Sequence, residues 1–162
     1  MLLLVGLQAV VFNHVHFFGY ATPMPYVYLL LILPSTTPRW AFLLIGFLLG
    51  LTCDLFTNTP GMAAAATTAL AFVLPPMLRL FVPRDFDEDA MFLPSVSSME
   101  WWPFMRYALF AVLLHHALFF VLESFTFFRP LSLLLDTLGS TLLTLLLIAI
   151  FEALGSAKPA KS

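Results

Sequence analysis

Long apolar runs alternate with short gaps of charged, small or proline residues along the whole chain. Six such runs cover residues 1–18, 25–36, 39–56, 61–82, 104–127 and 131–155. A helix of about 17–25 mostly apolar residues crosses the roughly 30 Å of hydrocarbon in a membrane. The pattern therefore predicts an all-α protein, a polytopic transmembrane helical bundle with about six spans. We expect a single domain over residues 1–155 and a short cytoplasmic tail at 156–162.

The second run, at 25–36, is short for a span, and Pro34 and Pro38 close it. A run of this length can thin the bilayer or place its polar ends at the interface. It can also enter the membrane as a re-entrant piece that its neighbours bury. The distribution of charge favours a crossing over the re-entrant alternative.

Positive charges are concentrated in alternate gaps between the runs. A six-span arrangement puts one set of them on the same side of the membrane: Arg39, Arg79, Arg84, Arg106, Lys158 and Lys161. The opposite side holds only Arg129. Because cytoplasmic loops carry the excess of lysine and arginine, both termini are predicted to be cytoplasmic. If the second run did not cross, these gaps would no longer fall on one side.

Composition identifies lipid as the surroundings of this chain. It is 61% apolar and 10% charged, with a mean hydropathy of +0.98. A water-soluble domain covers its surface with polar groups that this chain lacks. The tryptophans lie beside the gaps, where an amphipathic ring sits at the membrane interface: Trp40, Trp101 and Trp102. A net charge of −2 offers no basic surface for nucleic acid, and the single cysteine, Cys53, excludes an internal disulfide.

Polar and small residues within the runs are the candidates for function, since they are costly in a membrane. Gly46, Gly50 and Asp54 are spaced four apart, which puts them close to one face of a helix. Two glycines at this spacing let another backbone approach closely. We interpret the group as a helix-packing or partner-binding seam. Its aspartate either pairs locally, caps the next helix, or handles a ligand or proton.

The next run opens with a cluster of small residues that includes Gly61, Ala64 and Ala65. Small residues on several sides of a helix suit a position with close neighbours, so we add these three to the packing or partner-binding candidates.

His115, His116 and Glu123 are the other polar candidates, all within the run 104–127. His116 and Glu123, seven apart, lie on similar faces of a helix, and we include both among the partner-binding candidates. Adjacent histidines point about 100° apart, so one helix does not aim both at a metal. We expect neutral histidines hydrogen-bonded across helices, and Glu123 can pair with Arg129 or a partner's basic residue. The sequence predicts no metal site, no cofactor and no catalytic residue, and the chain is not expected to be an enzyme.

An ordered series of motifs resembles the bacterial rod shape-determining MreD family. The segments that carry the likeness are Pro23-Met-Pro-Tyr-Val-Tyr with Leu29 to Pro34, Pro38-Arg39, Gly46 to Phe56, and Thr59-Pro-Gly-Met-Ala-Ala. Each motif is weak alone, and their common order along nearly the whole chain makes the resemblance.

The resemblance implies a fold, a location and a set of partners. The family is similar in architecture to the six-helix substrate-binding subunits of energy-coupling-factor vitamin transporters. Its members are inner-membrane parts of the cell-elongation complex, and they bind the periplasmic coiled-coil protein MreC. Through MreC they associate with RodA, a penicillin-binding transpeptidase and MreB. The resemblance thus implies a membrane scaffold for peptidoglycan synthesis; the alternative is a small-molecule substrate-binding subunit of a transporter.

Overall fold

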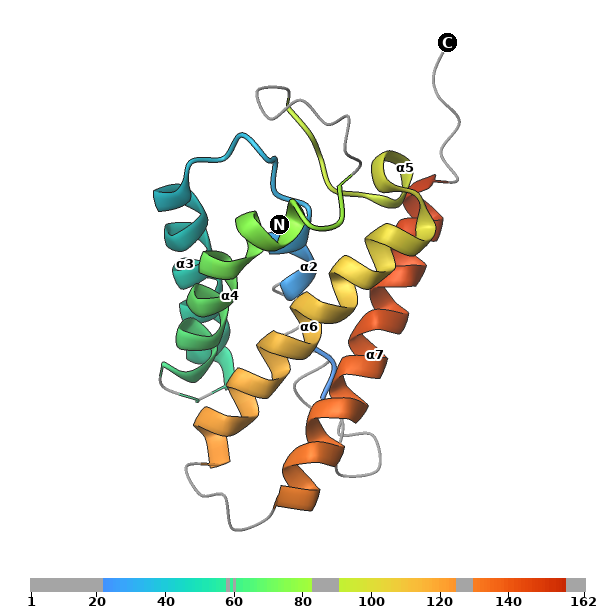
Figure 1. Ribbon diagram of the computed structural model, residues 1–162. Coiled ribbons are helices and arrows are strands. Elements are labelled where there is room, and N and C mark those ends of the chain that lie inside the picture. The colour runs from blue at the N-terminus through green and yellow to red at the C-terminus, as the bar shows by residue number, and fades with distance from the viewer. Residues whose placement is uncertain (1–21, 58, 60, 83–90, 125–129, 157–162) are drawn as a thin grey trace.

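The computed structural model describes residues 22–57, 59, 61–82, 91–124 and 130–156. This part of the chain is all-helical and holds no strand, as the composition of the runs predicts. The helices are α2 (Val27–Leu31), α3 (Arg39–Thr57), α4 (Met62–Leu78), α5 (Val96–Met99), α6 (Trp101–Ser124) and α7 (Pro130–Ser156) (Figure 1). The expected first span at 1–18 and the tail beyond Ser156 lie outside the described residues.

Three helical segments are long and apolar enough to cross a membrane. They are Arg39–Thr57, Trp101–Ser124 and Leu131–Gly155, with 19, 24 and 25 residues. Helix α4 is also apolar but shorter, at 17 residues. Large apolar side chains point outward, among them Phe72 at 67% exposed and Leu142 at 70%. The described helices are therefore compatible with a multi-pass membrane protein.

The four long helices form two antiparallel pairs. Helix α3 packs along α4, and α6 packs along α7, while α4 also contacts α6 and so joins the pairs. Figure 1 shows α2 lying between the two pairs, at the centre of the arrangement. Apolar side chains of α4 and aromatic residues of α6 fill this centre: Ala66, Leu70, Phe104 and Tyr107 are all almost fully buried.

The run 25–36 does not form the expected membrane-crossing helix. Helix α2 has five residues, which at 1.5 Å per residue is about 7.5 Å long. Its Val27, Leu30 and Leu31 are completely buried, against α3, α4 and α6. Hydropathy alone does not distinguish an apolar run that faces lipid from one that its neighbours enclose. The run 25–36 is of the enclosed kind, since its neighbours bury α2.

Helix α4 continues through Pro75 and Pro76 and ends at Leu78. The sequence predicts a kink or an end at these prolines, because each removes a backbone donor. The helix ends only one turn later, so the missing donors disturb just its last turns.

Candidate functional site

The glycines of α3 lie against the backbone of α4. A Cβ atom placed on Gly46 would come within 2.8 Å of Ala71 Cβ and 2.9 Å of the Thr67 carbonyl oxygen. One placed on Gly50 would come within 2.5 Å of both the Ala63 carbonyl oxygen and Ala64 Cα. Real Cβ atoms do not approach backbone this closely, so both positions require glycine for this helix–helix distance.

Asp54, one turn beyond Gly50, caps the N-terminus of α4. Its carboxylate accepts the backbone N–H groups of Ala63 and Ala64, each at 2.9 Å, and the Thr59 hydroxyl at 2.9 Å. The side chain is only 4% exposed. These N–H groups are among those that a helix start leaves without an intrahelical acceptor, and a carboxylate also complements the positive end of the helix dipole. Among the alternatives for Asp54, the geometry is that of local pairing and capping.

Ala64 and Ala65, although adjacent, face different surroundings. Ala64 is 4% exposed and lies against Gly50, whereas Ala65 points outward. Ala65 belongs to an apolar groove on the outer surface of α3 and α4, which we call the α3–α4 groove. Its lining is Leu43, Phe47, Leu51, Gly61, Ala64, Ala65, Thr68, Ala69, Phe72 and Val73.

His116 is completely buried and bridges α6 and α7. Its Nδ1 lies 2.8 Å from the Val112 carbonyl oxygen, which can only accept, so Nδ1 carries the proton. Its Nε2 therefore accepts the hydroxyl proton of Thr144 at 3.3 Å. The Thr144 oxygen in turn accepts the backbone N–H of Met24 at 3.0 Å. This is the cross-helix hydrogen bonding expected of a neutral histidine.

His115 is also completely buried and faces the segment before α2. Its Nε2 lies 3.2 Å from the Tyr26 hydroxyl, and the Tyr26 hydroxyl lies 3.6 Å from the Met24 sulfur. Its Nδ1 is buried and has no hydrogen-bond partner among the described residues. No group of three or more His, Cys, Asp or Glu side chains that could hold a metal ion occurs within the described residues.

The hydroxyl face of α7 supports this network, and the sequence reasoning missed it. Thr137, Ser140, Thr141 and Thr144 are buried on one face of the helix. Ser140 Oγ accepts the Thr22 N–H at 3.0 Å, so two hydroxyls of α7 accept backbone N–H groups of the segment before α2, those of Thr22 and Met24. The spacing of three and four between these residues is visible in the sequence and could have indicated a polar face within an apolar helix.

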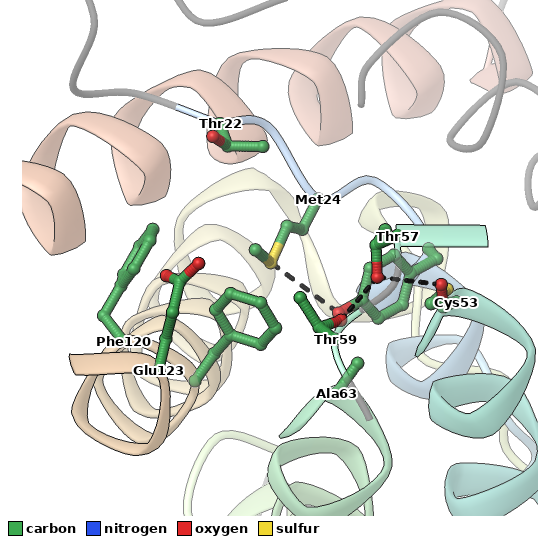
Figure 2. A pocket seen from close by; sticks show the side chains of 10 residues that line it. Thr22, Met24, Cys53, Thr57, Thr59, Ala63, Phe120 and Glu123 are labelled. Atoms are coloured by element: carbon green, nitrogen blue, oxygen red, sulfur yellow. Dashed lines mark hydrogen bonds between the residues drawn. The ribbon is translucent and has the colours of Figure 1, made fainter. Parts of the chain in front are cut away.

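A cavity of about 200 Å³ lies between this segment, the end of α3 and the end of α6 (Figure 2). We call it the outer cavity, since it lies at the α3–α4 turn, the end expected to face outward. Its lining is Thr22, Met24, Tyr26, Cys53, Thr57, Thr59, Ala63, Phe119, Phe120 and Glu123. Of the candidate residues, only Glu123 lines it. Asp54 lies behind Thr59, and His116 lies deeper, beside Thr144.

A second buried carboxylate, Glu152 near the end of α7, was also missed. It accepts the Tyr28 hydroxyl at 2.7 Å and the Val96 N–H at 2.9 Å, and it is 5% exposed. It thereby connects α2 and α5 to α7. A single acidic residue near the end of an apolar run gives no sequence signal for such a role.

Comparison with protein-family models, with curated proteins and with solved structures finds no match for this chain. Its function is therefore argued from its own residues and surfaces.

Proposed function

We propose that this chain is an integral membrane scaffold of the bacterial cell-elongation complex, related to the MreD family. In this proposal it lies in the inner membrane with both termini in the cytoplasm. It organises lateral peptidoglycan synthesis and cell shape by binding an MreC-like coiled-coil protein, and through that protein RodA, a penicillin-binding transpeptidase and MreB. The order of the motifs along the chain and the helices able to cross a membrane support it.

The observation that carries the proposal is the α3–α4 groove. Gly61, Ala65 and Ala69 are spaced four apart in its lining, together with the large rings of Phe47 and Phe72. In hydrocarbon, helices associate by close packing of backbones over small residues, since apolar burial gives no advantage over lipid. A groove with small residues between aromatic rings suits one further transmembrane helix. We assign that helix to the MreC-like partner.

The test is to enlarge a groove residue and measure recovery of the partner. Ala65→Ile fills the groove from an outward position, whereas Ala64→Ile would instead separate α3 from α4 at Gly50. Ala153→Ile, at an exposed position on α7, is the matched control. Tagged chains are purified from native membranes in mild detergent, and retained proteins are quantified by mass spectrometry. We expect Ala65→Ile to lower recovery of the MreC-like protein about tenfold and the control to retain it. Equal recovery from both variants would remove this face from the proposal.

The outer cavity favours a second candidate, the substrate-binding subunit of a transporter. It combines hydroxyls, one carboxylate and aromatic side chains, as small-molecule sites do. The same purification distinguishes the two functions. Recovery of paired ATPases with a coupling subunit would support the transporter, and recovery of cell-wall synthases would support the scaffold.

A further inference from the structure

A segment between α4 and α6 lies at the end of the bundle opposite the outer cavity. It covers residues 91–99, includes α5, and is called the strap below. Figure 1 shows α5 beside the end of α7, and α5 contacts both α6 and α7. Within the strap, Ser98 Oγ accepts the Ser95 N–H at 3.1 Å and lies 2.6 Å from the Leu93 carbonyl oxygen. These internal hydrogen bonds make the strap one local unit.

One buried carboxylate holds the strap on the bundle. Glu152 of α7 is 5% exposed, and its two oxygens accept the Val96 N–H at 2.9 Å and the Tyr28 hydroxyl at 2.7 Å. Val96 is the first residue of α5, and Tyr28 lies in α2. Loss of either bond changes the hydrogen bonding of a buried polar group, which is costly. The same side chain therefore ties the strap and the central helix α2 to α7.

A second contact joins the strap to the chain that follows α2. The Ser35 N–H donates to the Phe92 carbonyl oxygen at 2.8 Å, and Ser35 Oγ accepts the Phe92 N–H at 3.0 Å. At the other end of α2, its N-cap residue Tyr26 lines the outer cavity. Helix α2 has only five residues, so it connects the attachment of the strap directly to a wall of that cavity.

Strained backbone opposes the docking of the strap. Glu100, which joins α5 to α6, has φ 65° and ψ 166°, a conformation that essentially only glycine adopts. Such a conformation persists only where the surrounding structure fixes it. Here Met99 on one side is 1% exposed, and Phe104 on the other is completely buried. Undocking frees Met99 and lets Glu100 relax, so the strain favours release while the bonds to Glu152 favour docking.

We propose that the strap is a latch that docks on Glu152 and undocks as one unit. When docked, it fixes α2 through the shared carboxylate, and through α2 it fixes the Tyr26 wall of the outer cavity. The latch thus couples the two ends of the bundle by a chain of packed and hydrogen-bonded groups with two arrangements, as long-range coupling requires. This device goes beyond both candidate functions and depends on neither.

The first experiment removes the bond between the strap and Glu152. Val96→Pro deletes the N–H and suits the first position of a helix after the extended Ser95, whereas Val96→Ala keeps the N–H and is the matched control. Hydrogen–deuterium exchange is measured on the full chain in nanodiscs. We expect Val96→Pro to accelerate exchange about tenfold in residues 91–99 and also in 27–31, with the control like the parent. Unchanged exchange in 91–99, acceleration there without any in 27–31, or equal acceleration by the control would overturn the proposal.

The second experiment tests the strain, and its expected effect has the opposite sign. Glu100→Gly lets the backbone adopt the observed conformation without cost, so exchange in residues 91–99 should slow about fivefold. Glu100→Ala removes the same carboxylate but keeps a Cβ atom, and it should exchange like the parent. Exchange in α3, residues 39–57, should be the same in every variant, which separates undocking of the strap from loss of the fold. Unchanged or faster exchange of the strap in Glu100→Gly would show that no strain loads the latch, contrary to the proposal.

Discussion

Asp54 supplies the capping side chain that the start of α4 lacks. Gly61 occupies the N-cap position in the left-handed conformation, with φ 84°, and has no side chain to accept an N–H. Asp54 accepts two N–H groups there from the end of the preceding helix. A capping bond contributes about 0.5–2 kcal/mol. This local role accounts for a buried aspartate without requiring a partner's cation.

The first prediction concerns this cap. Asp54→Asn keeps one acceptor oxygen but turns an amide donor toward an N–H group, so we expect a loss of about 1–3 kcal/mol in the free energy of unfolding. Thermal unfolding in detergent measures it, with Asp136→Asn as the control. If Asp54 instead pairs with a partner's cation, the isolated variant will unfold like the parent, and only complex recovery will fall.

The second prediction compares two buried threonines of α7. Thr144→Val leaves the Met24 N–H and His116 Nε2 without partners, which should cost about 1–3 kcal/mol in the free energy of unfolding. Thr141 serves as the comparison, because its buried hydroxyl has no hydrogen-bond partner within the part of the chain that the structure describes. Thr141→Val should therefore be neutral or stabilising. Equal unfolding temperatures for both variants would show that the His116–Thr144–Met24 network contributes nothing.

At the scale of the elements, the backbones of α3 and α4 come close together because α3 has glycines, which lack side chains, at the contact. Gly46 faces Ala71 and Thr67, and Gly50 faces the backbone of Ala63 and Ala64. Because Gly50 meets backbone atoms, the helices would have to separate to admit a side chain there.

The third prediction follows from this contact. Gly50→Ala should lower the free energy of unfolding by about 1–3 kcal/mol, the usual cost of overpacking. Gly155→Ala is the control, since apart from its own helix and chain neighbours no described residue lies within 4 Å of the position of its added Cβ. Unfolding temperatures of both variants in the same detergent give the answer. An unchanged Gly50→Ala protein would mean that α3 and α4 lie farther apart than the structure places them.

The sequence predicts the long helices better than it predicts the buried segments between them. Expected runs at 39–56 and 131–155 are close to Arg39–Thr57 and Pro130–Ser156. Helix α6 begins at Trp101, three residues before the expected start, because Pro103 in a first turn needs no backbone donor. The short length of α2 and the position of the cavity could not be predicted from the sequence. Both depend on contacts between hydroxyls and small residues that are far apart in the chain and come together only on folding.

At the scale of the whole molecule, the ends of the bundle differ in chemistry. Figure 1 shows that α3 and α6 begin at the same end at which α4 and α7 finish. Arg39, Arg79 and Arg106 are exposed at this end. Trp40 and Trp102, 68% and 70% exposed, lie there as well. Basic residues and tryptophans together are typical of the cytoplasmic membrane interface.

The last prediction is the orientation of this end. Because α3, α4, α6 and α7 alternate in direction, Thr36 and the end of α7 lie at the same end of the bundle whether or not the run 25–36 crosses. The expectation that a run that does not cross would put the basic gaps on different sides is therefore wrong for the gaps after this run. Thr36→Cys should resist a membrane-impermeant maleimide in intact cells and react after permeabilisation. Leu131→Cys, 69% exposed at the start of α7, should react in intact cells. The unsubstituted chain is the control, since its Cys53 is buried. Labelling of Thr36→Cys in intact cells would put the basic end outside and reverse the accessible side of the outer cavity.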